Sequence, residues 1–337
     1  MKIIIFETEA WEQDAFRPLG EEHDLELLET KLTRKNAGEY ADADVISTFI
    51  YSDLSREVLD QFQDLKLIAT RSTGYDHIAL DCCEGQDITI SNVPEYGDNT
   101  VAEHVFGLLL ALSHNLVEAV DRTRRGDFSL QGLRGFDLRG KTLGVIGTGS
   151  IGQYVIQIAQ GFRMEVIAHD GAPDQELADR LNFEYRSLDG VLSAADIITL
   201  HVPANPKTHH LISDQEFQQM KEGVVVINTA RGGVLDIEAL SRALADGKVA
   251  AAGLDVLPEE PTIREESELL HSFYHEQHNL RTLLAGHVLL RLRRVIITPH
   301  SAFYTKEAIQ RIVVTTVENI RAFLNGSPVN VIPTNQS

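Results

Sequence analysis

The chain has 337 residues, of which 43% are hydrophobic and 24% are charged, as expected for a globular protein of about two domains. Fifty acidic residues against thirty basic ones leave a net charge of −20, and so acidic a surface repels phosphate backbones and anionic lipids. Nucleic acid and membrane surfaces are therefore not expected partners. The two cysteines, Cys82 and Cys83, are adjacent and poorly placed for a structural disulfide, so we expect a reducing, cytoplasmic compartment.

The first part of the chain alternates short apolar runs with helical patterns. The opening "MKIIIFE" has an apolar run too short for a signal peptide and predicts a strand over 2–6. Further strands are expected at 44–50, 66–70 and 88–92. A long helix is predicted near 99–124; its most apolar part carries Glu103, His104, His114 and Glu118, which favours a buried helix over a transmembrane one.

A second series of strand-like runs follows that helix. They are "KTLGVIG", "MEVIAHD", "DIITLHVP", "GVVVINTARG", "VAAAGLDV" and "RVIITPHS", and the last element, 304–325, reads as a helix. Such alternation is typical of an α/β protein in which helices cover both faces of parallel sheets, and two such doubly wound sheets are expected here.

A glycine-rich turn lies between the first two strands of the second series. In "LGVIGTGSIGQYVIQIAQGFRMEVIAHD", Gly147 permits a tight turn, Gly149 lets a pyrophosphate approach the backbone, and Gly152 lets helix and strand pack closely. The next strand ends on Asp170, an acid suited to bind the adenosine ribose and to repel a 2′-phosphate. The motif with its flanking elements predicts a dinucleotide site that prefers NAD to NADP.

Three polar residues follow later strands, where ligands of open α/β sheets bind. Arg231, Glu260 and His300 are a sufficient set for moving a hydride between NAD and a 2-oxo or 2-hydroxy acid. The guanidinium would clamp the carboxylate and polarise the carbonyl, the imidazole would exchange the proton, and the carboxylate would keep the imidazole charged. Taken singly, each has a plainer reading: a surface ion pair, a solvated acid or a structural histidine.

Four segments carry a family resemblance. "GTGSIG", "INTARGGVLD", "GLDVLPEEP" and "TPHSA", in this order and spacing, resemble the D-isomer-specific 2-hydroxyacid dehydrogenases, and "TPHSAFYT" is similar to the D-lactate dehydrogenase branch. The resemblance implies a Rossmann-type NAD domain at 99–300 and a flavodoxin-like substrate domain built from 1–98 and 301–337, with a crevice between them. It places the family's catalytic arginine, glutamate and histidine on Arg231, Glu260 and His300.

The resemblance also implies the binding residues. Backbone amides around Gly74 and Tyr75 would bind the substrate carboxylate with Arg231, and Tyr51 and Tyr96 would shape the substrate pocket. For the cofactor, residues beyond the glycines and Asp170 are implied at the pyrophosphate, along the site and near the nicotinamide: Ser150, Ile151, Val202, Pro203, Thr208, Thr229, Ala230 and Asp255. A homodimer through the NAD domains is expected.

The expected reaction is the reversible reduction of a 2-oxo acid, with pyruvate favoured, to the D-2-hydroxy acid. Alternatives are a dehydrogenase for phenylpyruvate, 2-oxoisocaproate or hydroxypyruvate, or an NAD-binding scaffold of the corepressor type. The stretch 262–294 is longer than in phosphoglycerate-type members, and a comparable extension occurs in the lactate-type branch. No metal site is expected: His271, His275 and His278 favour solvated helix positions over a ligand set.

Overall fold

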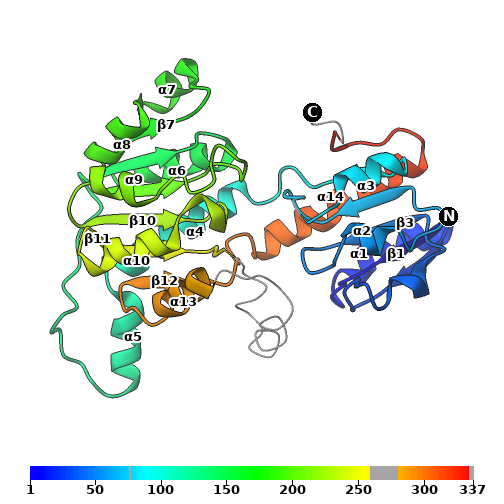
Figure 1. Ribbon diagram of the computed structural model, residues 1–337, viewed down its shortest axis with the longest axis horizontal. Helices are drawn as coiled ribbons and strands as arrows, with labels where there is room; N and C mark the ends of the chain where they lie inside the picture. The colour runs from blue at the N-terminus through cyan, green and yellow to red at the C-terminus, as the bar shows by residue number, and fades with distance from the viewer. Residues whose placement is uncertain (76, 259–279, 334–337) are drawn as a thin grey trace. The chain divides into compact units, whose positions relative to one another are not determined.

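A computed structural model describes residues 1–75, 77–258 and 280–333, with side chains left out at 280–284. The chain forms two compact units: Met1–Gly97 with Thr305–Ser337, and Asp98–Tyr304. We call these unit 1 and unit 2 and describe each separately (Figure 1).

Unit 1 is built on a five-stranded parallel sheet in the order β2-β1-β3-β4-β5. Its strands are β1 (Lys2–Ile5), β2 (Asp24–Leu27), β3 (Val45–Thr48), β4 (Leu67–Thr70) and β5 (Thr89–Ser91). Its helices are α1 (Gln13–Phe16), η1 (Arg17–Glu21), η2 (Ala37–Tyr40), α2 (Arg56–Leu59), α3 (Leu80–Gly85) and α14 (Lys306–Leu324). This strand order is that of flavodoxin-like sheets.

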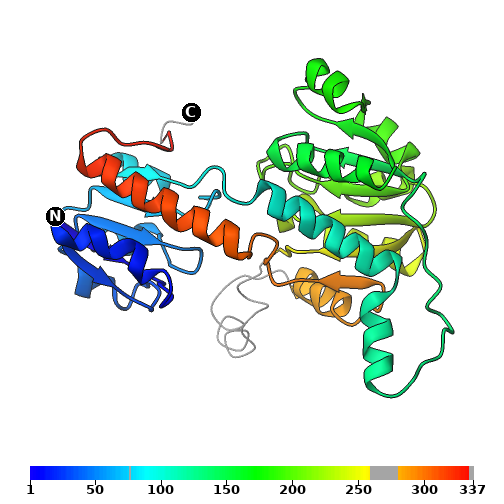
Figure 2. The same ribbon diagram turned by 180° about the vertical axis from the view of Figure 1, so that it is seen from behind.

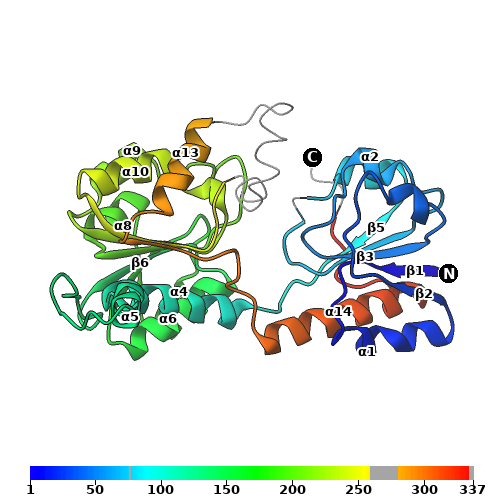
Figure 3. The ribbon, with the colours of Figure 1, turned by 90° about the horizontal axis from the view of Figure 1, so that it is seen from below.

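Both faces of the unit 1 sheet are covered, which explains its continuous apolar strands. Alternate residues of β1 enter different cores: Ile3 and Ile5 pack with Val313 of α14, while Ile4 packs with Leu59 of α2. Figure 3 shows α1 and α14 on one side of these strands and α2 on the other.

Unit 2 contains a seven-stranded parallel sheet in the order β12-β11-β10-β9-β6-β7-β8. Its strands are β6 (Thr142–Ile146), β7 (Glu165–His169), β8 (Glu184–Tyr185), β9 (Ile197–Leu200), β10 (Val224–Asn228), β11 (Val249–Leu254) and β12 (Val295–Ile297). Helices α4 (Asp98–Ser113) and α6 (Ser150–Gly161) lie on one face, and α8 (Leu188–Ala194), α9 (Asp214–Gln219) and α10 (Ile237–Ala245) on the other (Figure 3). The remaining helices are α5 (Leu116–Arg124), α7 (Gln175–Leu181), η3 (Gly232–Val234) and α13 (Leu280–Leu289).

The order of the unit 2 strands reverses between β6 and β9, because the chain runs outward from β6 through β7 and β8 and then returns to β9 on the other side. Such a switch point is where doubly wound sheets bind dinucleotides. The predicted α/β class with two doubly wound parallel sheets is confirmed.

The single helix predicted near 99–124 is wrong, because α4 and α5 meet at a 61° bend. Asn115 between them adopts a left-handed conformation with φ 52°, which ends a helix, and the amide of Phe136 donates to the carbonyl of Ser113 at the end of α4. Figure 2 shows α5 and the loop after it extending away from α4. No single helix of the described residues is long and apolar enough to cross a membrane, and α4 and α5 pass that test only as a bent pair.

Candidate active site

Three loops of interest leave neighbouring strands at the carboxyl edge of the unit 2 sheet. Arg231 lies three residues after β10, Asp255 directly follows β11, and His300 lies three residues after β12. The loops are linked in series: the amide of Asp255 donates to the carbonyl of Asn228 at 2.9 Å, and the amide of His300 donates to the carbonyl of Asp255 at 2.9 Å. Adjacent parallel strands thus bring together residues that are distant in the sequence.

Asp255 organises the turn that carries His300. Its side chain is only 1% exposed, and its two oxygens accept hydrogen bonds from the hydroxyl of Thr298 and from the amides of Ser301 and Ala302, both amides at 2.9 Å. A buried carboxylate is tolerated when its oxygens are hydrogen-bonded in this way. The resemblance implied a place near the nicotinamide for this acid; the structure gives it contacts with the turn itself.

His300 adopts a backbone conformation that is uncommon for a residue with a side chain. Its φ is 53°, in the left-handed region, and its amide donates to the carbonyls of Thr298 and Asp255. Such a conformation costs about 1 kcal/mol or more for a non-glycine residue, and it persists where surrounding bonds hold it. The backbone of the turn therefore has a defined shape at His300.

A second histidine supports this turn from α4. The Nε2 of His104 lies 3.0 Å from the hydroxyl of Thr298 and 3.5 Å from a carboxylate oxygen of Asp255. From the sequence, His104 was noted only as a polar residue of an apolar helix, and Thr298 was not singled out. Their shared contact could not be read from the sequence, because it depends on α4 packing beside β11 and β12.

The loop after β10 is shaped by Asn228, a buried residue that the sequence analysis did not single out. Its side-chain oxygen accepts from the amide of Ala230 at 3.0 Å, and its amide group donates to the carbonyl of Arg231 at 3.1 Å. The next residue, Gly232, lies so close to the β11 loop that a Cβ would stand 2.2 Å from the carbonyl carbon of Leu257. The backbone around Arg231 is thus fixed on both sides.

The glycine-rich turn after β6 has the shape that a pyrophosphate needs. Gly147 has φ 97°, and a Cβ there would lie 2.4 Å from the carbonyl oxygen of His201; one on Gly152 would lie 2.2 Å from the carbonyl oxygen of Gly147. No atom lies within 4 Å of a Cβ on Gly149, which precedes the first helical residue, Ser150. The open space at Gly149 and the N-terminus of α6, with Ser150 and Ile151 in its first turn, fit a phosphate group.

Asp170 stands at the end of β7, beside this turn. One carboxylate oxygen accepts from the amide and hydroxyl of Thr148, at 2.7 and 2.9 Å, and the other from the amide of Ala172 at 2.9 Å. Desolvation raises the pKa of Asp170, but these hydrogen bonds outweigh it and hold the pKa below its usual value. The carboxylate is therefore ionised at neutral pH, as an acid that repels a 2′-phosphate must be.

The loop after β9 forms the next part of this edge. Val202 lies beside Gly147, and the hydroxyl of Thr208 donates to the carbonyl of Pro203 at 2.6 Å while it accepts from the amide of Asn205. The hydroxyl of Thr208 therefore makes hydrogen bonds within its own loop, whereas the family resemblance implied only a place beside the cofactor. Directly after β10, by contrast, the hydroxyl of Thr229 is buried and has no hydrogen-bond partner among the residues that the structure describes, which fits a cofactor group there.

Unit 1 carries the residues expected at the substrate carboxylate. Gly74 and Tyr75 follow β4, and neither amide donates to a protein acceptor among the described residues. The hydroxyl of Ser72 donates to the carbonyl of Gly74 at 2.6 Å, and that of Thr73 to the carbonyl of Val93 at 2.8 Å. The peptide groups of 74 and 75 are held while their N–H groups stay available, which suits binding of an anion.

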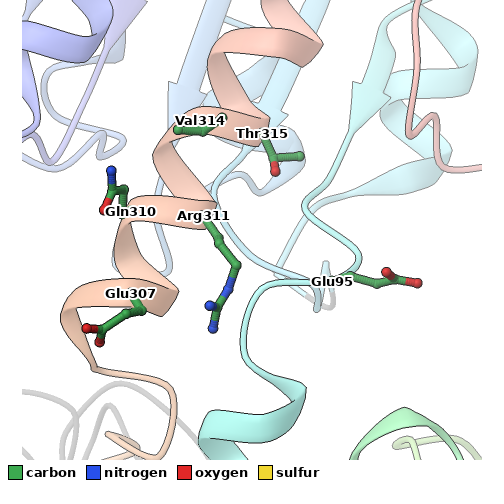
Figure 4. A pocket seen from close by; sticks show the side chains of 6 residues that line it. All are labelled: Glu95, Glu307, Gln310, Arg311, Val314 and Thr315. Carbon is green, nitrogen blue, oxygen red and sulfur yellow. The ribbon is translucent and has the colours of Figure 1, made fainter.

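The two expected pocket tyrosines also belong to unit 1. Tyr51 is 55% exposed in the loop after β3. Tyr96 lies in the segment before α4, where Arg311 of α14 donates to its carbonyl at 2.6 Å. Figure 4 shows Arg311 reaching toward this segment from a hollow of about 460 Å³, which is lined by Glu95, Glu307, Gln310, Arg311, Val314 and Thr315.

Several predicted positions lie outside the described residues. They are Glu260, the three histidines at 271, 275 and 278, and most of the 262–294 stretch. Among the residues that are described, no group of three or more His, Cys, Asp or Glu side chains could hold a metal ion.

Comparisons with known proteins extend these observations. The family model for the D-isomer specific 2-hydroxyacid dehydrogenase NAD-binding domain matches residues 106–302. The chain is 34% identical over 327 residues to D-lactate dehydrogenase of Escherichia coli K12, covering 95% of this chain and 96% of the relative. It is 35% identical over 331 residues to an aromatic 2-oxoacid reductase of Clostridium sporogenes, covering 96% of each.

Among solved structures, the chain is similar to D-lactate dehydrogenase from Aquifex aeolicus in complex with NAD and lactic acid. The TM-score is 0.84 at 35% sequence identity, with 97% of this chain and 96% of that chain covered.

Proposed function

Because the chain belongs to the D-isomer specific 2-hydroxyacid dehydrogenase family, we propose that it reduces a 2-oxo acid, with pyruvate favoured, reversibly to the D-2-hydroxy acid. NAD is its cofactor, as the family and the open phosphate cradle at Gly149 indicate. The choice of substrate is the finer part of the proposal. Two relatives of almost equal identity bear the names of a D-lactate dehydrogenase and an aromatic 2-oxoacid reductase.

The proposal rests mainly on the turn of residues 298–302, which contains His300 and is held by hydrogen bonds to Asp255. An acid–base group must stand at a defined position, and His300 lies in a turn whose neighbouring residues Ser301 and Ala302 are held by the buried carboxylate of Asp255. In the proposed reaction, His300 donates a proton to the carbonyl oxygen of the 2-oxo acid. Glu260 is proposed to keep the imidazole charged before that transfer.

The other residues bind and orient the substrate. Arg231 pairs with its carboxylate through two N–H groups and polarises the carbonyl, and the amides of Gly74 and Tyr75 donate to the same carboxylate. Bound NADH supplies the hydride to the carbonyl carbon. Tyr51 and Tyr96 are proposed to contact the substrate side chain and so to set which 2-oxo acids are accepted.

A panel of 2-oxo acids tests this function. Initial rates of NADH oxidation are measured with pyruvate, hydroxypyruvate, 2-oxoisocaproate and phenylpyruvate, and we expect the highest kcat/KM with pyruvate. A higher value for phenylpyruvate would move the assignment to the aromatic alternative. Tight NADH binding without turnover of any member would favour the corepressor-like scaffold instead.

We also propose a homodimer through unit 2 and a cytoplasmic location. Helix α5 has no buried residues, and the loop after it exposes Phe128 and Leu130 by 79% and 84%, more apolar surface than a monomer ordinarily presents at one place. Light scattering should give the mass of a dimer for the wild type and of a monomer for the double variant Phe128→Asp, Leu130→Asp.

The cytoplasmic location is proposed because the free thiols of Cys82 and Cys83 suit a reducing compartment.

A further inference from the structure

Glu7, directly after the buried end of β1, makes contacts that an ordinary strand-end residue does not. One carboxylate oxygen accepts from the amide of Phe49 at 2.9 Å and from the hydroxyl of Ser52, and the other accepts from the amide of Tyr51 at 2.9 Å. Three donors from one short loop thus converge on one carboxylate. We call residues 49–52, which follow β3, the Tyr51 loop.

The backbone of Glu7 has an energetically unfavourable conformation. Its φ is 55°, in the left-handed region, where a glutamate is uncommon. The carbonyl of Glu7 accepts from the guanidinium of Arg71 at 2.8 Å, and the same nitrogen donates to the carbonyl of Phe6 at 2.6 Å. Backbone strain of this kind persists where the surroundings hold it, and it gathers at functional sites.

Arg71 also contacts the Tyr51 loop, through the ring of Phe49. Its side chain is 1% exposed, and its guanidinium carbon lies 5.8 Å from the ring centroid of Phe49. It directly follows β4 and precedes the Ser72–Tyr75 segment proposed to bind the substrate carboxylate. Arg71 therefore contacts both the end of β1 and the Tyr51 loop, and the segment proposed to bind the substrate carboxylate follows it directly in the chain.

The Tyr51 loop combines a buried anchor with an exposed aromatic side chain. Ser52 is buried and its oxygen also accepts from the amide of Leu32, but the tyrosine beside it is more than half exposed. A rigid loop that displays an exposed aromatic side chain is what contact with a small substrate requires.

We propose that Glu7 is a positioning residue for the substrate: its carboxylate fixes the Tyr51 loop and so sets where Tyr51 meets the side chain of the 2-oxo acid. This inference rests on the proposed function, because Tyr51 is assigned to the substrate pocket there. Glu7 touches neither the cofactor nor the reacting atoms in this account, so it acts on substrate binding and selection.

Two substitutions separate positioning from folding. Glu7→Gly removes the carboxylate but relieves the backbone strain, because glycine adopts a φ of 55° readily. Glu7→Gln keeps the shape but places an amide donor against the N–H and O–H donors of the loop. The matched control is Glu57→Gln, an exposed acid on α2 in the same unit. Emission of Trp11, the only tryptophan of the chain, reports whether unit 1 stays folded.

We expect both Glu7 variants to raise KM for the best 2-oxo acid about tenfold or more, while kcat falls less and the Kd of NADH stays within about twofold. The ratio of kcat/KM between pyruvate and phenylpyruvate should also move toward one. In a Tyr51→Ala background, Glu7→Gln should add little to KM, because the side chain that it positions is gone.

Wild-type turnover with an unchanged KM in the folded Glu7 variants would overturn the positioning role alone, and so would a full effect of Glu7→Gln in the Tyr51→Ala background. Absence of any turnover by the wild type would overturn the proposed function itself. Should both Glu7 variants unfold, Ser52→Ala removes one donor and leaves the backbone of Glu7 intact. We expect it to raise KM by a few-fold, and an unchanged KM would count against the proposal.

Discussion

Asp255 uses both of its carboxylate oxygens to hold the turn of residues 298–302. In Asp255→Asn, an amide group would face the hydrogen-bond donors of Thr298, Ser301 or Ala302, so at least one buried donor loses its acceptor. We expect the free energy of unfolding to fall by about 1–3 kcal/mol and kcat/KM for reduction to fall at least about tenfold. Denaturant unfolding and steady-state kinetics measure both, with the exposed Asp246→Asn as control. Wild-type values for Asp255→Asn in both experiments would refute this role.

Asp170 is predicted to select NADH over NADPH. Asp170→Ala removes the anion that repels a 2′-phosphate and the acceptor for the ribose hydroxyls, so NADH should bind more weakly and NADPH more tightly. Fluorescence titration of both cofactors gives the ratio of their Kd values, which should move toward one. Asp179→Ala, at an exposed position of α7, should leave the ratio unchanged. A wild-type protein that already prefers NADPH would contradict the assignment.

The loops after β10 and β11 are in close contact at Gly232. A Cβ there would lie 2.2 Å from one carbon and 2.4 Å from the neighbouring oxygen and nitrogen of the 257–258 peptide, all backbone atoms that cannot rotate away. Gly232→Ala should therefore separate the loops, displace Arg231 and lower both the melting temperature and kcat/KM. The control Gly161→Ala, at the end of α6, meets no atom within 4 Å and should leave both unchanged or raise the melting temperature slightly. Equal melting temperatures for the two variants would show that the close approach has no energetic weight.

Sequence patterns predicted the elements that are apolar and buried. The runs at 44–50 and 66–70 became β3 and β4, which are buried along their whole length. The strands that were missed, β2 and β8, lie at sheet edges, and their sequences "DLEL" and "EY" have only intermediate or exposed residues. Edge strands bury one side or less, so their sequences carry little apolar signal.

The candidate site likewise contains some features that could be predicted from the sequence and others that could not. The turn at Gly147–Gly152 could be predicted because its backbone demands glycine at fixed positions. The contacts of Asp255 with Thr298, Ser301 and Ala302 could not, because they form only when β11 and β12 pair. His104 and Asn228 were likewise ordinary residues in the sequence; only packing places them beside the loops of His300 and Arg231.

The stability of the folded chain at acid pH should be lowered by His201. Part of the residue is exposed, but its ring is desolvated beside Thr199, and burial lowers the pKa of His201 to about 3. In the unfolded chain the imidazole of His201 would take up a proton at its ordinary pKa of 6.5. The free energy of unfolding is therefore unaffected by His201 above pH 6.5. Below that pH it falls by up to about 1.4 kcal/mol per pH unit, because the unfolded chain binds a proton that the folded chain does not.

Urea unfolding followed by circular dichroism at pH 7, 6 and 5 measures this effect. The wild type should lose more stability over that range than His201→Gln, which has no titrating group at this position. Equal losses for the two proteins would mean that the imidazole is hydrated in the folded state.

We propose that this chain transfers a hydride from NADH to a 2-oxo acid and forms the D-2-hydroxy acid. The most direct test is chiral analysis of the product formed from pyruvate and NADH, with His300→Gln run in parallel. We expect D-lactate as the single product of the wild type and little product from His300→Gln. Formation of L-lactate or of a racemate, or wild-type rates in His300→Gln, would contradict it.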